Sequence, residues 1–534
     1  MIAINGTGVS AGIAEGTVFC YKRASASAET KRADDPKTEL ERWKNASDKA
    51  DAQLDALAEK TRTEIGDEAA MLFETHRMML DDLDYTDRIT EFITAEKYSA
   101  EAAVTAAGKE FSEMFAAMND DYMKARSVDV TDISNRVVSI LNGSGYGAVL
   151  DKPSVILADD LTPSETVQLD KKMILGFILS GGNANSHTAI LARTLGIPAI
   201  INADIDPNGG YEGRQVIMDG SVGYIVIDPD DTTREYLGKK QREEKAVRAM
   251  LEQLKGQPDV TADGKEIKVY ANITSPADVD AVITNDARGI GLFRSEFLYL
   301  GSDDFPTEDV QFEAYKSVVQ RMNGARVIIR TMDIGADKKI GYFGLADEEN
   351  PALGMRALRI CLSRPEIFKT QLRALYRASA YGKLAVMFPM VSSLWEVQEA
   401  KRLCTAVMTE LKKERIPFDS ELELGVMIAP ELAKKVSFFS IGTNDLTQYT
   451  IAVDRQSIQG LERFYDPKHP SVLRMIKMTA DAAHEAGIWA GICGELAADC
   501  SLTDTFIKMG IDELSVSPRF VLPVRNAVRS SYLK

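Results

Sequence analysis

The sequence lacks the long apolar runs and the leader that would mark a membrane or secreted protein. No segment reaches the roughly 18 consecutive apolar residues of a membrane-spanning helix. The first residues, MIAINGTGVSAG, have neither the basic nor the apolar region of a secretion signal. We therefore expect a cytoplasmic protein. With 534 residues, 45% of them apolar, the chain is too long for one hydrophobic core, and we expect several domains.

Cysteine and positive charge are also scarce. The five cysteines are scattered and have no CxxC spacing, which argues against a disulfide framework and against a zinc site. They are Cys20, Cys361, Cys404, Cys493 and Cys500. The formal net charge of −17 repels phosphodiester backbones, and no basic stripe offsets it. Nucleic-acid binding is therefore not expected, although a few arginines can still hold a small anion.

The pattern of apolar residues changes along the chain and predicts several domains. Residues 1–22 and the block after Ser154 contain short apolar runs separated by Gly, Asp and Pro, as α/β structure does. Between them, Phe111, Met114 and Phe115 begin a helical spacing that recurs from Ile133, and these stripes are expected to form a core. We predict an α/β domain of residues 1–22 plus 143–229, an inserted helical bundle over 23–142, a charged linker helix over 230–262, and a last domain over 263–534.

The last domain alternates strand-like and helix-like segments. Its eight β-rich runs are IKVYAN (267), GIGLF (289), RVIIRT (326), AVMFPM (385), ELGVMI (423), VSFFSIG (436), IWAGI (488) and DELSV (512). Eight strands separated by helix-length segments predict a (β/α)8 TIM barrel. A Gly-rich dinucleotide fingerprint is absent after every run, which argues against a doubly wound sheet.

Polar side chains follow directly after several of these runs. They are Arg294 after GIGLF, Arg330 at the end of RVIIRT, Asn444 and Asp445 after VSFFSIG, and Cys493 after IWAGI. Catalytic groups of TIM barrels lie at the C-terminal strand ends, so these side chains are expected to meet there. Arginines bind phosphate or carboxylate, an Asp beside an Asn can hold magnesium, and a thiol can pass a proton. Singly, each arginine is equally well explained as a structural ion pair and the cysteine as core filler, but together they favour an active site.

One of the four histidines, His187, has an unusual context in the stretch SGGNANSHTAILARTLGIPAI. Ser186 is a plausible N-cap, HTAILARTL a two-turn helix, Gly196 its left-handed C-terminal residue, and Pro198 the stop. At a helix start the imidazole is kept neutral and nucleophilic, and free backbone N–H groups can receive a phosphoryl group. Covalent capture of phosphate is the chemistry that such a position would serve. Structural roles are expected instead for the other three, which are His76, His469 and His484.

Taken together, the motifs resemble the enzyme I family of the phosphoenolpyruvate-dependent sugar phosphotransferase system. The likeness covers essentially the whole chain, and the motifs come in the family's order. They are LTPSET (161), SHTAILARTLGIPA (186), GIGLFRSEFLYL (289), RTMDIGADK (330), ENPALGMRALRI (349), FFSIGTNDLTQYTIAVDR (438) and CGELAAD (493). A single one of these motifs would be weak evidence, whereas the ordered set is specific.

The resemblance implies an activity and a set of residue roles. His187 would take the phosphoryl group of phosphoenolpyruvate and pass it to a histidine-containing phosphocarrier protein docked on the helical insertion. The other implied roles are phosphate binding by Arg294 and Arg330, phosphate and Mg²⁺ binding by Asn444 and Asp445, substrate binding by Arg455 and Arg356, and proton donation to the enolpyruvate by Cys493. The family also forms homodimers through its barrel.

Two departures from the family pattern stand out. Asn183, Ala184 and Asn185 make the spacer before Ser-His one residue longer than is common, which we expect to be tolerated. After the strand ending GVM, the family continues with Glu-Thr-Pro, and that glutamate is the second protein ligand of magnesium. Here Pro430 follows almost at once, with about eight residues fewer, although crossovers between parallel strands usually take at least about 10–12 residues. Glu431 is not expected to replace the ligand. Either a loop is missing from this sequence, which the otherwise intact site favours, or half of the metal site is lost.

Three functional hypotheses follow. The leading one is an enzyme, a phosphoenolpyruvate-protein phosphotransferase that uses Mg²⁺. An ATP-consuming relative, such as a pyruvate phosphate dikinase, would need a nucleotide-binding domain, for which the strands and the helical bundle before His187 leave no room. The alternative from another class is a regulatory scaffold that binds phosphoenolpyruvate or the carrier and has an impaired metal site. It is motivated by the shortened segment after Ile428 alone.

Overall fold

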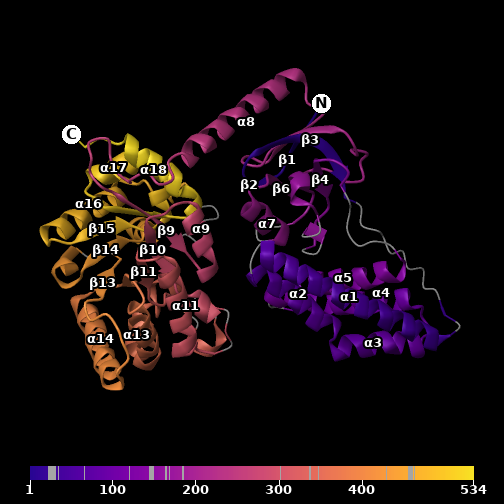
Figure 1. Cartoon of the computed structure of the whole chain (residues 1–534), viewed down its shortest axis with the longest axis horizontal. Coiled ribbons are helices and arrows are strands. Elements are labelled where there is room, and N and C mark those ends of the chain that lie inside the picture. Colours follow the sequence, from indigo (N-terminus) through magenta and orange to yellow (C-terminus); the bar gives the residue numbers. More distant parts are fainter. Residues whose placement is uncertain are drawn as a thin grey trace. The chain divides into compact units, whose positions relative to one another are not determined.

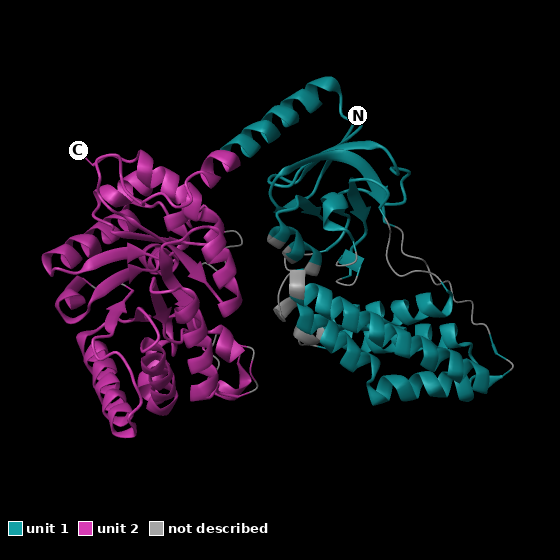
Figure 2. Cartoon of the chain, viewed as in Figure 1, with its two compact units in different colours: residues 1–247 teal, residues 248–534 magenta. Residues whose placement is uncertain are grey.

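The computed structural model describes the chain as two compact units, residues 1–247 and residues 248–534 (Figure 2). The described residues are 1–21, 32–33, 35–64, 67–118, 121–143, 150–162, 165–166, 169–182, 186–300, 302, 304–335, 338, 340–346, 348–427, 430–454, 461 and 463–533. Each unit is described by itself below.

The first unit contains an eight-stranded mixed sheet. In chain order its strands are β1 (Ile2–Asn5), β2 (Thr7–Ser10), β3 (Ile13–Cys20), β4 (Ser154–Ala158), β5 (Ile174–Leu179), β6 (Ala199–Ile201), β7 (Gln215–Asp219) and β8 (Tyr224–Ile227). They lie in the order β1-β8-β7-β3-β4-β5-β6-β2. The parallel pair β3–β4 joins strands that are more than a hundred residues apart, which confirms that the N-terminal strands pack with the later α/β block.

The described residues between β3 and β4 form a helical insertion (Figure 1). Its helices are α1 (Pro36–Glu64), α2 (Asp67–Leu80), α3 (Leu83–Thr94), α4 (Ala100–Ala116) and α5 (Asp121–Leu141). Ile133 and Val137 are each 1% exposed in the core of this bundle, as their helical spacing predicts. Met114 is 46% exposed, so the prediction that this methionine lies in the core is wrong. Helical periodicity identifies a face of a helix but not what covers that face.

Two further helices follow strands of this sheet. Helix α7 (His187–Leu195) follows β5, and helix α8 (Asp231–Glu252) follows β8. Leu237 is the buried residue of α8, whose remaining surface is mostly charged, as the composition of this segment predicts. Lys240 of α8 forms an ion pair with Asp219 at the end of β7, which ties the start of the helix to the sheet.

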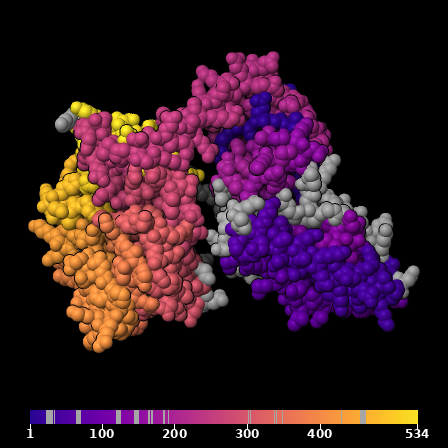
Figure 3. All heavy atoms as spheres, in the orientation of Figure 1, coloured from indigo at the N-terminus to yellow at the C-terminus, as the bar shows by residue number. Residues whose placement is uncertain are grey.

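The second unit is a closed barrel of eight parallel strands. They are β9 (Lys268–Ile273), β10 (Gly289–Arg294), β11 (Arg326–Arg330), β12 (Leu384–Phe388), β13 (Glu423–Val426), β14 (Phe438–Ile441), β15 (Trp489–Ile492) and β16 (Glu513–Val516). All eight coincide with the β-rich runs of the sequence, and the TIM-barrel prediction is confirmed. The helices of this unit are α9 (Val279–Thr284), α10 (Phe297–Leu300), α11 (Glu308–Arg321), α12 (Leu358–Ser363), α13 (Pro365–Ser379), α14 (Leu394–Glu414), α15 (Thr443–Ile451), α16 (Pro470–Glu485), α17 (Thr503–Lys508) and α18 (Val521–Ser530). Helices α13 and α14 form part of its outer surface (orange in Figure 3).

The short connection between β13 and β14 closes the barrel despite its length. Its regular part is one 3-10 helix, η6 (Pro430–Lys435), in place of a full α-helix. Leu432 and Ala433 of η6 are buried, and the strands still pair in register at Gly425↔Phe438 and Val426↔Phe439. The crossover is therefore physically sufficient, contrary to the difficulty that its length suggests. Ile428 and Ala429 lie outside the described residues.

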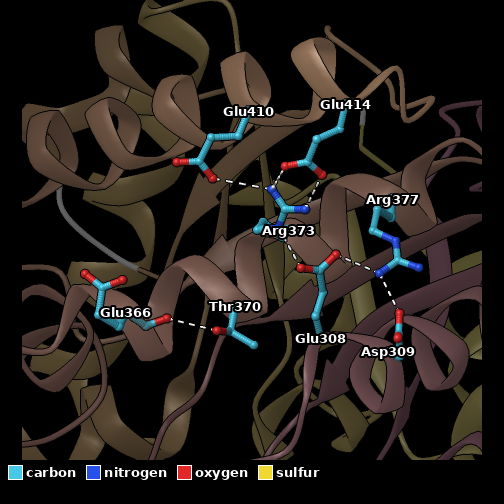
Figure 4. A network of polar contacts seen from close by, with 8 residues as sticks. All are labelled: Glu308, Asp309, Glu366, Thr370, Arg373, Arg377, Glu410 and Glu414. Atoms are coloured by element: carbon cyan, nitrogen blue, oxygen red, sulfur yellow. Dashed lines mark hydrogen bonds and ion pairs between the residues drawn. The ribbon is translucent and has the colours of Figure 1, made fainter.

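An ion-pair network joins three helices on the outside of the barrel (Figure 4). Arg373 of α13 donates to Glu308 at the start of α11 (2.6 Å) and to Glu414 on α14 (2.7 Å). Arg377, one turn further along α13, donates to the other oxygen of Glu308 (2.6 Å) and to Asp309 (2.8 Å). The acidic partners on α11 are its first two residues, where negative charge also favours the helix dipole.

Replacement of Arg373 by Met is expected to destabilise the barrel by about 1–2 kcal/mol, since several linked ion pairs are lost while the aliphatic stem is kept. Chemical denaturation of the full chain measures this change. Arg402→Met is the matched control, because Arg402 pairs with Glu399 on its own helix and its side chain is 63% exposed. We expect no measurable change for the control, and equal stability of both variants would show that the network contributes nothing.

Candidate active site

A cavity of about 610 Å³ opens at the C-terminal ends of the barrel strands. It brings together six of the residues that the sequence singled out: Arg294, Arg330, Arg356, Asn444, Asp445 and Cys493. Arg294 and Arg330 are the last residues of β10 and β11, Asn444 and Asp445 begin α15 after β14, and Cys493 follows β15. A seventh candidate, Arg455, lies outside the described residues.

Two buried arginines of the cavity are held by carboxylates. Arg330 donates to Glu296 (2.8 Å) and approaches Asp333 (3.1 Å), while Arg356 donates to the other oxygen of Asp333 (2.8 Å). Burial opposes the charge of Arg330, but Glu296 and Asp333 raise its pKa above the ordinary value. Burial likewise opposes ionisation of Asp333, but Arg330 and Arg356 hold the pKa of that carboxyl below its usual range. Each guanidinium is thereby fixed in one orientation, which suits the recognition of an anion of defined shape.

Two other cationic side chains of the cavity, unlike these arginines, are not held by carboxylates. Arg294 is half-buried, and neither Arg294 nor Lys338 forms an ion pair within the described part of the chain. Both side chains line the cavity. Since a guanidinium without a carboxylate partner can accept phosphate oxygens in a bidentate manner, Arg294 is the best placed group for a ligand anion.

The donor set for a metal ion is small. Asp445 is 8% exposed at the cavity wall, and the carbonyl oxygen of the neighbouring Asn444 side chain accepts from the Glu495 backbone N–H (3.2 Å). Among the described residues no group of three His, Cys, Asp or Glu side chains could hold a metal. Glu431 is exposed on η6 and is not among the described residues that line the cavity. The residues therefore fit a magnesium-like ion only if bound substrate supplies further oxygens, which is the usual manner of Mg²⁺ binding.

Cys493 is a buried thiol at the inner wall of the cavity. It is 3% exposed, and its Sγ donates to the Ser440 carbonyl at 3.8 Å. Burial raises the pKa of this thiol, Glu513 acts in the same direction, and Arg330 and Arg294 oppose them. Cys493 therefore remains a protonated thiol near neutral pH, as a proton donor requires.

Sequence reasoning missed several residues of this site. Glu296, Asp333 and Lys338 all lie within the quoted motifs, but they were not singled out. Tyr449 was missed as well, and its hydroxyl contacts Arg356 at 3.5 Å. For Asp333 the available signal was a carboxylate three residues beyond Arg330, a buried arginine at a strand end. A buried arginine in such a position needs a partner, so the carboxylate was the expected one.

His187 lies in the first unit as the first residue of α7. The predicted caps of that helix are confirmed. The Ser186 side chain accepts from the Ala189 N–H at 3.3 Å, and Gly196 ends the helix in the left-handed conformation, with φ of 65°. The next residue, Thr188, is buried and donates to the Leu161 carbonyl at 3.0 Å, which anchors the helix start. The spacer of residues 183–185 lies outside the described residues.

The other three histidines make structural contacts. His76 is fully buried on α2, with its Nε2 3.1 Å from Asp129. His469 caps α16 by accepting from the Ser471 N–H at 3.2 Å, and His484 lies 2.9 Å from Asp512. The expectation of structural roles for these three is consistent with these partners.

The fold is a TIM barrel, and the arginines of its cavity suit a small anion with phosphate or carboxylate groups. The sequence matches three protein-family models: PEP-utilising enzyme, N-terminal, over residues 5–126; PEP-utilising enzyme, mobile domain, over 150–223; and PEP-utilising enzyme, PEP-binding domain, over 248–533.

Similar curated proteins span nearly the whole chain. The phosphoenolpyruvate-protein phosphotransferase of Priestia megaterium is 38% identical over 98% of this chain and 93% of its own length. That of Bacillus subtilis (strain 168) is 39% identical over 99% of this chain and 94% of its own length. Among solved structures, an NMR solution structure of enzyme I is 31% identical, covers 45% of this chain and 99% of that chain, and has a TM-score of 0.40.

The chain belongs to the phosphoenolpyruvate-protein phosphotransferase family, and it is therefore an enzyme of phosphoryl transfer. Enzymes that utilise phosphoenolpyruvate in this family work with a metal cofactor. In the described part of the chain, no helix is both long and apolar enough to cross a bilayer.

Proposed function

We propose that this enzyme binds phosphoenolpyruvate in the barrel cavity, transfers its phosphoryl group to His187, and then passes that group to a histidine-containing phosphocarrier protein in the cytoplasm. The observation that carries the proposal is the convergence of Arg294, Arg330, Asp445 and Cys493 on one cavity. Phosphoenolpyruvate needs the features found there, which are cations for its phosphate and carboxylate groups and a proton donor for its methylene carbon.

The arginines have different proposed roles in substrate binding. Arg330 and Arg356 are fixed by Glu296 and Asp333, so they orient the substrate with little loss of conformational freedom. Arg294, which has no ion pair among the described residues, is the proposed ligand of the phosphate group. Arg455 is proposed as a further substrate ligand on the resemblance alone.

The chemical step breaks the bond between phosphorus and the enolate oxygen and forms a bond between phosphorus and a ring nitrogen of His187. The N-terminus of α7 favours the incoming negative charge through its backbone N–H groups. The thiol of Cys493 then gives its proton to the methylene carbon of the enolpyruvate, so that pyruvate forms and a thiolate remains.

Mg²⁺ is the proposed metal, and Asp445 with Asn444 would hold it together with substrate oxygens. When bound, the ion would neutralise negative charge on the phosphate. The alternative is a non-catalytic scaffold, suggested by the missing Glu-Thr-Pro stretch after Ile428. The barrel closes across that segment, and Asp445 remains at the cavity, which supports the enzyme over the scaffold.

The helical insertion of residues 23–142 is the proposed docking surface for the carrier protein. Among its described residues, the most exposed large apolar side chains are Met71 and Met78 on α2 and Leu83 at the start of α3 (61%, 75% and 77%). If these side chains form a contiguous patch, another protein that covers it would remove them from water. The remaining proposed domains are residues 1–22 plus 143–229 around His187, the linker over 230–262 and the barrel over 263–534.

Intact-mass measurement of the full chain after incubation with phosphoenolpyruvate and Mg²⁺ tests the function. We expect one added phosphoryl group, which is labile in acid as phosphohistidine is, and which maps to the peptide containing His187. A protein that gains no mass, or gains it on another peptide, contradicts the proposal.

We also propose that the enzyme is a homodimer through its barrel. An apolar cavity of about 350 Å³ is lined by Leu353, Tyr449 and Met475, which are 62%, 37% and 40% exposed. A second copy of the chain that covers these side chains would remove them from water.

Met475→Asp is expected to weaken the dimer by about 2 kcal/mol, or about thirtyfold in dissociation constant, because a charge would be buried in an apolar contact. Sedimentation equilibrium measures the constant. Met250→Asp on α8 is the matched control, since Met250 is similarly exposed (44%) but lies far along the chain from this surface. Equal dimer affinities for both variants would contradict the assignment of this face.

A further inference from the structure

The barrel interior contains a carboxyl group that the reaction described above does not use. Glu513 is the first residue of β16, and its side chain is completely buried. Neither of its carboxyl oxygens has a hydrogen-bond partner among the residues that the structure describes. Since buried polar groups are nearly always hydrogen-bonded, a group of this kind needs an explanation.

Two glycines make room for this carboxyl group. A Cβ atom at Gly291 of β10 would lie 2.4 Å from Oε1 of Glu513, and one at Gly491 of β15 would lie 2.9 Å from the Glu513 Cβ. Strand β10 is not a hydrogen-bonded neighbour of β16, so the contact with Gly291 runs across the barrel interior. A glycine inside a strand weakens that strand, and a close approach by another group is a known reason for it.

The carboxyl group shares this interior with Ser440 and Cys493. Adjacent strands place Ser440 beside Gly491 and Gly491 beside Glu513, and β14 and β15 run side by side in Figure 1. Since Gly491 has no side chain, no side chain stands between Ser440 and Glu513 in this register. Within the described residues, the Ser440 hydroxyl is also buried without a hydrogen-bond partner. Cys493 is two residues beyond Gly491 on the same face of β15, and its thiol donates to the Ser440 carbonyl.

The Glu513 carboxyl group is mainly neutral at physiological pH. Burial is the main cause that raises the pKa of Glu513 to about 8. Asp512 and Glu423 act in the same direction, while Arg326 and Lys268 oppose them. Tyr270 on β9 and Cys493 on β15 are the other titratable groups of the surrounding strands, and both feel the charge of Glu513. Arg326 cannot pair fully with Glu513, because it donates to Glu423 at 2.8 Å and lies over the Trp489 ring.

We infer that Glu513 is the proton reservoir of Cys493, and that it returns a proton to the thiolate through a water molecule held between the Glu513 carboxyl and the Ser440 hydroxyl. This inference rests on the proposed role of Cys493 as proton donor to the enolpyruvate. Such a water would satisfy the buried oxygens of both side chains, which have no hydrogen-bond partner among the described residues.

The transfer balances as a simple proton shift. The O–H bond of the Glu513 carboxyl breaks, the bridging water accepts that proton and gives up another, and an S–H bond forms on Cys493. The thiol has a pKa raised above its ordinary value, so its thiolate is the stronger base and the shift runs downhill. Glu513 remains as a carboxylate and takes a proton from solvent after pyruvate leaves. Glu513 acts through Cys493, so it is a positioning residue of the proton path and does not touch the substrate.

Two exchange rates measured in one D₂O solution test the inference. The full-length protein is mixed with Mg²⁺, phosphoenolpyruvate and ¹³C-labelled pyruvate. Passage of ¹³C into phosphoenolpyruvate reports reversible phosphoryl transfer, and deuterium in the pyruvate methyl group reports renewal of the Cys493 proton from solvent. In Glu513→Gln we expect the ratio of deuterium uptake to ¹³C exchange to fall at least about tenfold. A loss of structure would slow both rates and leave their ratio unchanged.

The pH dependence separates the inference from a packing role. In the wild-type protein the ratio is expected to fall as pH rises through about 8, because Glu513 ionises there and no longer holds a proton to give. Glu513→Gln should show no such step. Glu399→Gln is the control, because this carboxylate pairs with Arg402 on α14, and it should keep the wild-type profile. A ratio in Glu513→Gln equal to that of the wild type overturns the inference.

If Glu513→Gln is unstable, a wild-type ratio that is constant from about pH 6 to about pH 10 also overturns the inference. Failure of the proposed function looks different, because the wild-type protein would then show neither ¹³C exchange nor a phosphoryl group on His187.

Discussion

His187→Ala protein incubated with phosphoenolpyruvate and Mg²⁺ is expected to gain no phosphoryl group, whereas the wild-type protein gains one. The reason is that covalent capture of phosphate needs an imidazole nitrogen at the start of α7, and alanine offers no nucleophile there. No neighbouring group can substitute for it, since Ser186 is committed to the Ala189 N–H and Thr188 to the Leu161 carbonyl. Intact-mass spectrometry under non-acidic conditions measures the effect directly.

The matched control for this variant is His484→Ala. His484 is partly exposed and contacts Asp512, away from the barrel cavity as its lining residues define it. This variant should gain the phosphoryl group as the wild type does. Calorimetric titration with phosphoenolpyruvate should show that His187→Ala still binds the substrate, because the binding residues lie in the barrel. A phosphoryl group on His187→Ala would assign the acceptor to another residue.

Arg330→Met is expected to lower kcat/KM for phosphoenolpyruvate by about 10³-fold, equivalent to roughly 4 kcal/mol of transition-state stabilisation. Two losses combine in this variant. The substrate loses a fixed cation, and Glu296 and Asp333 lose the buried charge that they neutralise. Arg330→Lys should recover only part of the loss, because an ammonium group keeps the charge but not the forked geometry. Steady-state rates of pyruvate formation with the carrier protein as acceptor measure both variants.

Arg402→Met is the control for the arginine variants. Arg402 pairs with Glu399 on its own helix and is not among the residues that line either cavity. We expect kcat/KM within about twofold of the wild type, as for most substitutions away from a functional group. If Arg330→Met retained activity within tenfold of the wild type, the assignment of Arg330 to substrate binding would be wrong.

Much of this architecture was predictable because its signals are local. The alternation of apolar runs identified all eight barrel strands, and Ser186 and Gly196 identified both ends of α7. Capping and strand formation depend on residues a few positions apart, so a short stretch of sequence carries the necessary information. The candidate residues at the strand ends were predictable for a related reason, since the barrel fold brings those ends to one face.

Other features could not be predicted because they depend on distant partners. Met114 has the spacing of a core residue, but its side chain is 46% exposed. The segment after Met427 looked too short for a crossover, yet η6 packs its buried residues in place of a full helix. In both cases the outcome depends on which surfaces meet, and a pattern along one segment does not contain that information.

The sequence by itself determined the order of the domains, the barrel, the start of α7 at His187 and the set of arginines, acids and thiol that the barrel strands carry. Only the tertiary structure decided that Asp333 lies between Arg330 and Arg356, and that the Glu513 carboxyl lies beside Gly491 within reach of the Cys493 strand. The physical reason is that ion pairs and proton paths act over a few ångströms. The closure of the barrel brings such groups together, although Glu513 and Gly291 are separated by more than two hundred residues of chain.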